Sequence, residues 1–330
     1  MEYRKLGSSD LQVSSITFGA WAIGGWMWGG AEEKDAIAAI NTSIEHGATS
    51  IDTAAVYGYG RSEEIVAKAI AGKRSQVQIL TKYGLRWDAT EGEHFFDWEE
   101  EGQTKNIYRN ARKKSIIQEC ENSLRRLKTD YIDLYQCHWR DHTTPVEETM
   151  DAMLTLIQQG KVRAAGVSNF TKEDIAAANK VCPIASNQPP YSMVLRDIEK
   201  DVLPYCRENG IGTIVYSPLQ RGLLTGKFKP DVEFKEGDHR ANQLHFKPEN
   251  IKRVNSMLDK LKPIAASHGA TLGQLVIAWT IAQPGITSAL VGARDAAQTK
   301  ENLKAQDIKL AQSDLAAINE AVESLTLVAV

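Results

Sequence analysis

Four ionisable side chains of this 330-residue sequence stand at or just after the ends of short apolar segments. Asp52, Lys82 and His138 each end a segment typical of a buried strand, and Tyr57 follows five residues after Asp52. A lysine ammonium beside a tyrosine favours the phenolate and is expected to lower its pKa from the ordinary value of about 10. Asp52 would hold Lys82 charged, and His138 could donate a hydrogen bond to a substrate oxygen. Such a set would polarise a carbonyl group and protonate its oxygen.

Each of these residues also has an ordinary structural interpretation. A lone aspartate after a strand is most often a helix cap, a lone lysine is usually solvated, and a lone histidine usually belongs to the core. Their occurrence at successive strand ends favours the chemical interpretation. The set holds no activated nucleophile, although a Schiff base on Lys82 is conceivable. His138 and His142 lack a cysteine or carboxylate at ligand spacing, so no metal site is expected.

Eight short apolar or β-branched segments, with amphipathic helical stretches between them, would have to position these side chains. Nearly continuous apolar character indicates strands buried on both faces, as in a parallel sheet. Eight alternations of strand and helix predict an α/β fold, the (β/α)₈ TIM barrel, in which chemistry belongs at the carboxyl ends of the strands. The segments are 13–20, 48–54, 77–83, 132–139, 163–170, 184–191, 212–219 and 286–293.

The chain is longer than a typical barrel of roughly 250 residues, and the extra length falls in three places. A β-hairpin is expected before the first strand, with its turn at Gly7-Ser8-Ser9. A polar and aromatic insertion runs from Tyr83 to about Arg112, and a second insertion runs from Leu219 to about Lys252. Both are expected as long loops at the C-terminal face. No linker or low-complexity tract interrupts the chain, so residues 1–330 are expected to form one domain.

Composition argues against nucleic-acid and membrane partners. The net charge is −3 with a pI near 6.2, and the lysines and arginines are scattered. The four cysteines form no C-x-x-C pair and the N-terminus has no apolar leader, which predicts a cytoplasmic protein. The uncharged stretch 269–293 is long enough to span a bilayer. Because Gln274 and Gln283 interrupt it and "QPG" is a turn, we expect a helix, a turn and a buried strand.

Protonating a carbonyl oxygen is half of a reduction, and the hydride for the other half requires a cofactor. No G-x-G-x-x-G follows a strand, so the usual dinucleotide fingerprint is absent from the sequence. Phosphates could bind instead to backbone N–H groups in two other segments. One is the glycine-bearing loop 217–228, which carries Arg221 and Lys227, and the other is the strand-to-helix junction 292–302, which carries Arg294.

Ordered motifs along nearly the whole chain resemble those of the aldo-keto reductase family. They are "GATSIDTAAVYGYGRSEEIVAKAI", "ILTKYG", "YIDLYQCHW", "GVSNF", "NQPPYS", "YSPLQRGLLTGK" and "GARDAAQTKENL". The opening "TFGAWAIGGWMWGG" is similar to bacterial members grouped with general stress protein 69 and the inositol-operon reductase.

The resemblance implies a role for each matching residue. Tyr57 would be the general acid, Lys82 and Asp52 would tune it, and His138 would orient the carbonyl. The nicotinamide carboxamide would contact Ser168, Asn169 and Gln188, with Tyr216 stacked on the ring. The pyrophosphate loop would comprise Ser217, Leu219, Gly222, Leu224, Gly226 and Lys227. The adenosine end would contact Gly292, Arg294, Gln298, Glu301 and Asn302.

The sequence departs from the family's pattern at the adenosine end. Many members have a Lys-Ser pair where this chain has Gly292-Ala293, and an arginine near Gln298. Arg294 is then the candidate partner for a 2′-phosphate. The resemblance therefore implies NADPH as the cofactor without excluding NADH.

We expect reversible, NADPH-dependent reduction of small aldehydes to alcohols, with ketones and sugars as further candidate substrates. Five tryptophans near the ends of the first, third and fourth strands are candidates for the walls of the substrate pocket: Trp21, Trp26, Trp28, Trp87 and Trp139.

Two alternatives come from other functional classes. One is a cofactor-binding regulatory subunit, because the family includes potassium-channel β subunits. The other is an aldolase that forms a Schiff base on Lys82, which would turn over its substrate without a nucleotide.

Overall fold

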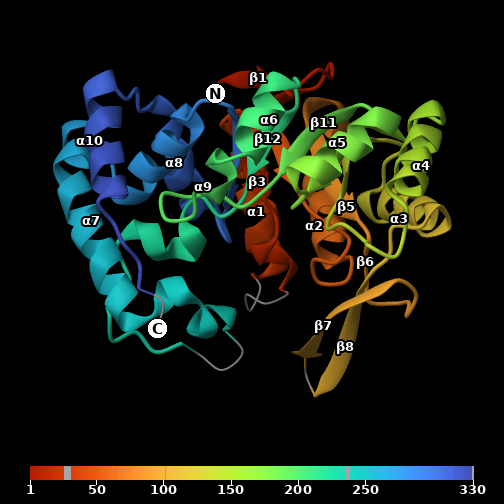
Figure 1. The fold of residues 1–330 in the computed structure, drawn as a ribbon, viewed down its shortest axis with the longest axis horizontal. Coiled ribbons are helices and arrows are strands. Elements are labelled where there is room, and N and C mark those ends of the chain that lie inside the picture. The colour runs from red at the N-terminus through yellow and green to blue at the C-terminus, as the bar shows by residue number, and fades with distance from the viewer. Residues whose placement is uncertain (26–30, 101, 235–237, 329–330) are drawn as a thin grey trace.

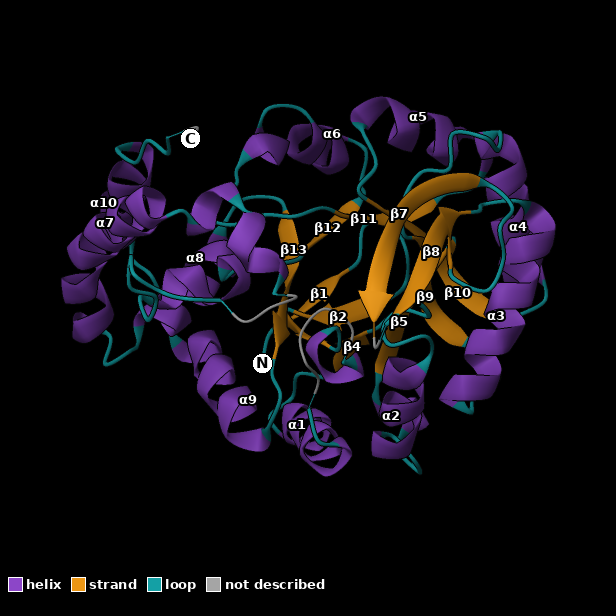
Figure 2. Ribbon diagram, turned by 90° about the horizontal axis from the view of Figure 1, so that it is seen from below, coloured by secondary structure: helices purple, strands orange, loops and turns teal. Residues whose placement is uncertain are grey.

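The computed structural model describes residues 1–25, 31–100, 102–234 and 238–328, and a closed barrel of eight parallel strands lies at its centre (Figure 2). The predicted (β/α)₈ fold is confirmed, since each predicted segment supplies one strand of the barrel. In order around the barrel, the strands are β3 (Ile16–Gly19), β4 (Ser50–Asp52), β5 (Gln78–Tyr83), β9 (Ile132–Cys137), β10 (Val162–Ser168), β11 (Ile184–Gln188), β12 (Gly212–Val215) and β13 (Ile286–Gly292).

Helices surround the barrel, and their buried apolar residues belong to the same core cluster as those of the strands. In α3, for example, Ile116, Cys120 and Leu124 recur at the helical period and are buried. Two further helices, α7 and α10, pack against each other at one side of the molecule (Figure 1). The helices are α1 (Glu33–Glu45), α2 (Arg61–Ala69), α3 (Lys113–Leu127), α4 (Val146–Gln158), α5 (Lys172–Val181), α6 (Val202–Glu208), α7 (Pro248–Ser267), α8 (Leu272–Ala282), α9 (Ala296–Leu303) and α10 (Gln312–Glu323).

The predicted N-terminal hairpin, β1 (Tyr3–Lys5) and β2 (Gln12–Ser14), closes one end of the barrel. Leu6 and Val13 are fully buried in a cluster with Leu80 and Leu134 from the barrel strands. Gly7 has a φ of 56°, and a Cβ there would lie 2.5 Å from a backbone oxygen of β11. A larger residue at Gly7 would collide with the barrel, so glycine is needed for the hairpin to pack this closely.

The insertion after β5 is a three-stranded antiparallel sheet, which corrects the expectation of a long loop. Its strands are β6 (Leu85–Arg86), β7 (Glu93–Glu100) and β8 (Gln103–Arg109), and the β7–β8 hairpin projects from the barrel in Figure 1. Alternate residues of β8 face opposite sides, with Ile107 buried and Asn106 exposed. The high share of charged residues in this segment obscured that alternation.

Most of the remaining irregular segments contain short 3₁₀ helices. The long connection after β12 carries three of them before α7 begins, so this predicted loop is largely irregular as expected. The 3₁₀ helices are Ala22–Gly24, Arg74–Gln76, Asp197–Glu199, Gln220–Thr225, His239–Asn242, Leu244–Phe246 and Lys304–Asp307.

The uncharged stretch 269–293 forms α8, a turn and the buried strand β13, as the sequence predicted. Within the described ranges, no single helix is long and apolar enough to cross a membrane. Helices α7 and α8 pass the same length and composition test only as a pair, and the chain bends by 88° between them.

A buried carboxyl group supports the point where the chain leaves the barrel for the inserted sheet. Glu119 of α3 accepts hydrogen bonds from the Gly84 backbone N–H at 3.1 and 3.2 Å and from the Ser115 hydroxyl at 3.3 Å. Burial raises the pKa of Glu119 to about 7, although the nearby Arg86 guanidinium opposes the shift. Near neutral pH, part of the population therefore carries an ionised carboxylate in the core.

Replacing Glu119 with glutamine is expected to stabilise the protein more at pH 8 than at pH 5. The folded-state pKa lies above the unfolded value, so ionisation costs nothing below about pH 4.5 and the full penalty applies above about pH 7. Glutamine stays neutral throughout. Urea titrations should show the difference in unfolding free energy, variant minus wild type, rising by about 2–3 kcal/mol over that range. A difference that does not change with pH would contradict the raised pKa.

Candidate active site

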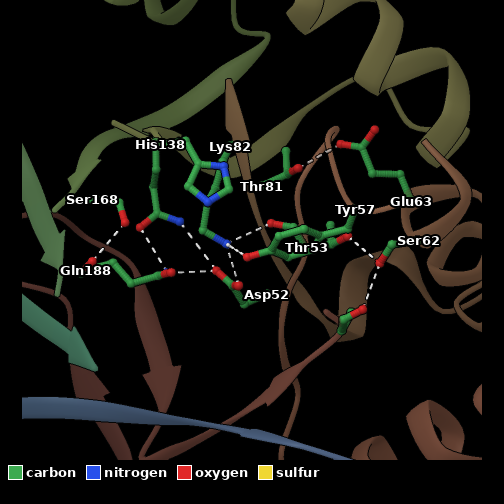
Figure 3. A network of polar contacts seen from close by, with 12 residues as sticks. Asp52, Thr53, Tyr57, Ser62, Glu63, Thr81, Lys82, His138, Ser168 and Gln188 are labelled. Atoms are coloured by element: carbon green, nitrogen blue, oxygen red, sulfur yellow. Dashed lines mark hydrogen bonds and ion pairs between the residues drawn. The ribbon is translucent and has the colours of Figure 1, made fainter. Parts of the chain in front are cut away.

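A buried ion pair lies at the C-terminal end of the barrel, formed by two side chains from neighbouring strands. The Lys82 Nζ donates to Asp52 Oδ1 at 2.6 Å and to the Thr53 carbonyl at 3.0 Å (Figure 3). The two side chains are 0% and 3% exposed. Strand β4 ends at Asp52 and β5 pairs with it in parallel, so both side chains reach the same end of the barrel.

Tyr57 lies over this pair, and its hydroxyl is 3.3 Å from Lys82 Nζ. Its ring faces Trp21 with centroids 6.1 Å apart and meets His138 edge-on at 5.8 Å. Tyr57 and His138 are each 9% exposed, so both are accessible only at the mouth of the site. The structure thus brings together all four side chains that the strand ends singled out.

The run of small residues around Tyr57 has a steric cause. Gly58 has a φ of 61°, and a Cβ there would lie 2.1 Å from the Gly24 carbonyl oxygen. The turn that carries Tyr57 therefore packs directly against the segment after β3. Below it, the hydroxyls of Thr53 and Ser62 share a hydrogen bond of 2.8 Å, and Ser62 donates to the Ala20 carbonyl at 3.0 Å. These contacts fix the tyrosine's backbone relative to the ion pair.

Burial, more than neighbouring charge, determines the protonation of the site. It raises the pKa of Tyr57 well above its usual value, with a further rise from the Asp52 carboxylate. This corrects the expectation of a lowered value, because the loss of water outweighs the attraction of the lysine. Burial also lowers the pKa of Lys82, against the opposing effect of Asp52. The pKa of His138 falls well below its usual value through burial and the Lys82 charge. Tyr57 therefore keeps its proton and His138 is neutral near pH 7.

A ring of amides and hydroxyls adjoins the ion pair. Gln188 Nε2 donates to Asp52 Oδ2 at 2.8 Å, and the Ser168 hydroxyl donates to the Gln188 carbonyl at 2.8 Å (Figure 3). Asn169 Nδ2 donates to the His138 carbonyl at 3.1 Å, and the Tyr216 hydroxyl donates to Asn169 Oδ1 at 2.8 Å. The residues expected at the nicotinamide thus form one hydrogen-bonded chain from the Asp52 carboxylate to Tyr216, the residue after β12.

The loop after β12 turns sharply, with positive φ at Ser217, Gln220, Arg221 and Gly222. Its predicted residues Ser217, Leu219, Gly222, Gly226 and Lys227 are at least partly exposed. Leu224 is fully buried, so only its backbone is available to a ligand.

Arg221 of this loop has one buried donor group, its Nε, without a partner among the described residues. Burial lowers the pKa of Arg221, and the like charge of Arg240 adds to that effect. An anion beside Arg221 would accept from the unpaired Nε and would offset both the burial of the guanidinium and the repulsion from Arg240. The loop therefore fits the pyrophosphate of a dinucleotide.

The predicted adenosine residues gather where β13 meets α9. Gln298 Oε1 accepts from the Arg294 backbone N–H at 2.8 Å, and Asn302 Nδ2 donates to the Gly292 carbonyl at 3.1 Å. Asp295 caps α9 by accepting from the Gln298 N–H at 2.7 Å. Glu301 is held by Gln274 at 2.8 Å. The Gly292 backbone and the Arg294 side chain are exposed, which leaves them accessible to a ligand.

Aromatic side chains pack around Tyr57. Trp21, Trp87 and Trp139, which the sequence proposed for the substrate pocket, belong to the apolar cluster that contains Tyr57. Trp26 and Trp28 lie outside the described residues. Four further aromatic residues that the sequence reasoning did not single out pack against the same cluster: Tyr59, Phe95, Phe96 and Trp98.

Gln136 is a further residue that the sequence reasoning missed. Its Nε2 lies 3.5 Å from Asp52 Oδ2, and its Oε1 accepts from Gln188 at 3.3 Å. Gln136 stands two residues before His138 in β9, so the period-2 alternation of a strand could have placed both on the inner face. Phe95 and Phe96 gave no comparable signal, because their strand was taken for a loop.

Comparisons with known proteins agree with this geometry. A family model described as "Aldo/keto reductase family" matches residues 15–323. The aldo-keto reductase YhdN of Bacillus subtilis is 40% identical over 98% of this chain and 94% of its own length. The NADH-specific methylglyoxal reductase of Escherichia coli is 36% identical over 97% of this chain and 98% of its own.

A solved structure and a relative of another kind extend the comparison. The glycerol dehydrogenase AKR11B4 from Gluconobacter oxydans superposes with a TM-score of 0.89 at 35% identity, covering 99% of this chain and 97% of that one. A probable voltage-gated potassium channel β subunit from Arabidopsis thaliana is 35% identical over 93% of this chain and 92% of its own. The members of the matched family are oxidoreductases that act on carbonyl compounds with nicotinamide cofactors. This chain belongs to the aldo/keto reductase family.

Proposed function

We propose that the protein reduces small aldehydes to alcohols with NADPH, reversibly, and that Tyr57 is the general acid. The observation that carries the proposal is the Tyr57 hydroxyl, 3.3 Å from a lysine that is itself paired with Asp52 at 2.6 Å. When bound, the nicotinamide supplies the hydride.

The protonation state and position of each of the four side chains indicate its proposed role. Protonated Tyr57 donates its proton to the substrate oxygen as negative charge develops there. Lys82 lies on the far side of that hydroxyl and stabilises the phenolate that remains. Asp52 holds Lys82 in place. Neutral His138 keeps one ring N–H, which can donate to the same substrate oxygen and orient the carbonyl.

The proposed cofactor contacts follow the residues described above. Ser168, Asn169 and Gln188 would hold the carboxamide, and Tyr216 would lie against the ring. The loop after β12, with Arg221, would bind the pyrophosphate. The junction of β13 and α9 would bind the adenosine end.

The aromatic mouth supports small substrates. Tyr57 lies beneath Trp21 and beside His138, so a long or branched carbonyl compound would meet aromatic walls on two sides. Two relatives, a methylglyoxal reductase and a glycerol dehydrogenase, are named for small oxygenated compounds, which supports the same class of substrate.

The direct test is consumption of NADPH and NADH against a panel of short aldehydes, ketones and sugars. The proposal expects turnover with several short aldehydes and a higher kcat/KM with NADPH. Absence of turnover with every compound and both cofactors would contradict it. That result would favour the regulatory-subunit alternative, which rests on the potassium-channel relative.

The Schiff-base alternative is opposed by the contacts of Lys82. An ammonium has three N–H donors, and acceptors lie at 2.6, 3.0 and 3.3 Å from this one. These contacts favour the charged form and oppose the effect of burial, which lowers the pKa of Lys82, whereas a Schiff base requires a neutral amine. Borohydride added with substrate should leave Lys82 unmodified, and a trapped adduct would support the aldolase.

Replacing Arg294 with alanine is expected to weaken NADPH binding by about 10–100-fold and NADH binding by much less. The loss of one charged hydrogen bond to phosphate accounts for this range. Fluorescence titration with both cofactors measures the change, and Lys300→Ala, which removes an exposed cation from the nearby helix α9, is the control. Equal losses for both cofactors would contradict a 2′-phosphate contact.

A further inference from the structure

The face of the inserted sheet that looks toward Tyr57 carries an arginine that the proposed chemistry does not use. Arg109 of β8 stands opposite Leu85 on one side and Glu93 on the other. Directly opposed residues of antiparallel strands share a face. Leu85 and Ile107, which share this face, pack in the apolar cluster that contains Tyr57. The Arg109 side chain is therefore on the face of the sheet that looks toward the catalytic tyrosine.

Arg109 is held flat against the aromatic wall. Its guanidinium carbon lies 3.8 Å from the centroid of the Phe95 ring and 5.6 Å from that of Trp139. The two rings are themselves 5.3 Å apart. Trp139 directly follows His138 in the sequence. The guanidinium therefore lies close to the residue next to the proposed catalytic histidine. Stacking of this kind fixes the plane of the guanidinium and the directions of its donors.

The polar contacts of Arg109 leave donor capacity unused. Its Nη1 donates to Glu93 Oε1 at 3.3 Å, a long ion pair. Its Nε is buried and has no acceptor in the part of the chain that the structure describes. The other oxygen of Glu93 accepts from the His142 backbone N–H at 3.2 Å. A donor with spare N–H groups thus stands beside an acceptor with spare lone pairs.

Both groups are partly withdrawn from water without being sealed off. The Arg109 side chain is 16% exposed and the Glu93 side chain 31%. A hydrogen bond formed there is worth more than one at a fully exposed pair, because fewer water molecules compete for it. A purely alkyl group placed against the pair would displace water and leave the N–H unsatisfied.

We propose that Arg109 and Glu93 bind a hydroxyl group of the substrate, so that the preferred aldehydes carry a hydroxyl near the carbonyl. A hydroxyl both donates and accepts one hydrogen bond, and so it matches the carboxylate and the guanidinium together. A substrate carboxylate would meet repulsion from Glu93. This inference rests on the proposed reductase function and names a substrate class for that same site.

The test compares glyceraldehyde with propanal, which has the same carbon chain and lacks the two hydroxyl groups. Wild type, Arg109→Met and Glu93→Gln are assayed for kcat/KM with both aldehydes. Arg112→Met is the matched control, because Arg112 is half exposed and its carboxylate neighbour Glu91 is 4.0 Å away. We expect Arg109→Met to lower the glyceraldehyde-to-propanal ratio of kcat/KM by about 10–100-fold. Glu93→Gln should lower it less, and Arg112→Met should leave it within about twofold.

Three results would overturn the inference. An equal loss with both aldehydes would assign Arg109 to the packing of the aromatic wall. An unchanged ratio would show that no hydroxyl reaches Arg109. Failure of the wild type to reduce either aldehyde would overturn the reductase function itself. The wild-type assay alone gives that result, so it is distinct from a failure of the Arg109 contact.

Discussion

Replacing Tyr57 with phenylalanine is expected to lower kcat for aldehyde reduction by about 10²–10⁴-fold. The substitution keeps the ring and its contacts with Trp21 and His138, and removes only the hydroxyl 3.3 Å from Lys82. Because the proton moves in the transition state, the loss should appear in kcat and not chiefly in KM. Steady-state rates with a reactive aldehyde and NADPH measure both constants.

The control for this variant is Tyr205→Phe, which removes a tyrosine hydroxyl from α6, away from the site. Circular dichroism and NADPH titration should find both variants folded and able to bind the cofactor. A folded Tyr57→Phe variant with a kcat near that of wild type would mean that Tyr57 is only a packed aromatic residue. The mechanism proposed here would then be wrong.

Replacing Lys82 with methionine is expected to remove most of the reduction, by at least about 10²-fold, while NADPH binding is largely retained. Lys82 acts on the phenolate that Tyr57 leaves behind, and its contacts are Asp52, Thr53 and Tyr57. Fluorescence titration with NADPH separates the two effects. Abolished binding in a folded variant would make Lys82 a cofactor ligand or a structural residue instead.

The methionine variant leaves the Asp52 carboxylate buried without its cation, which typically costs about 3–5 kcal/mol of stability. The double variant Asp52→Asn, Lys82→Met removes both charges and is the control in case Lys82→Met does not fold. We expect it to be more stable than Lys82→Met and equally slow. If the double variant recovered the activity, the lysine charge would not be needed for catalysis.

The barrel, and the meeting of four ionisable side chains at one end of it, could be predicted because both follow from local patterns. Continuous apolar runs indicated the eight strands, and Asp52, Lys82 and His138 stand where those runs end. In a parallel barrel the carboxyl ends of all strands lie at the same face. Residues that end different strands in the sequence are therefore expected to lie close together in the fold. Gln188 and Ser168 followed from the resemblance to the family.

The sign of the Tyr57 pKa shift could not be predicted from the sequence. The shift depends on how much water the surrounding residues exclude from Tyr57, and only the folded structure shows that packing. The nearby lysine was apparent from the sequence, whereas the desolvation that outweighs it was not.

The inserted sheet was missed for a related reason. Charged residues stand on both faces of this hairpin, so its hydrophobic pattern is weak. Asp97 and Glu99 of β7 are exposed on one face, and in β8 Lys105 and Arg109 share the other face with buried Ile107. As a result Phe95, Phe96 and Arg109 could not be assigned to the site. Their places depend on the register with β6, which pairs Leu85 with Arg109.

Deuterium transfer from the cofactor tests the hydride donor and the role of Tyr57 in one experiment. The protein is incubated with a short aldehyde and NADPH carrying deuterium at both C4 positions, and the product alcohol is analysed by mass spectrometry and NMR. The account predicts one deuterium on the former carbonyl carbon with wild type, and about 10²–10⁴-fold slower formation of the same product with Tyr57→Phe. An alcohol free of deuterium, or equal rates for the two proteins, would contradict it.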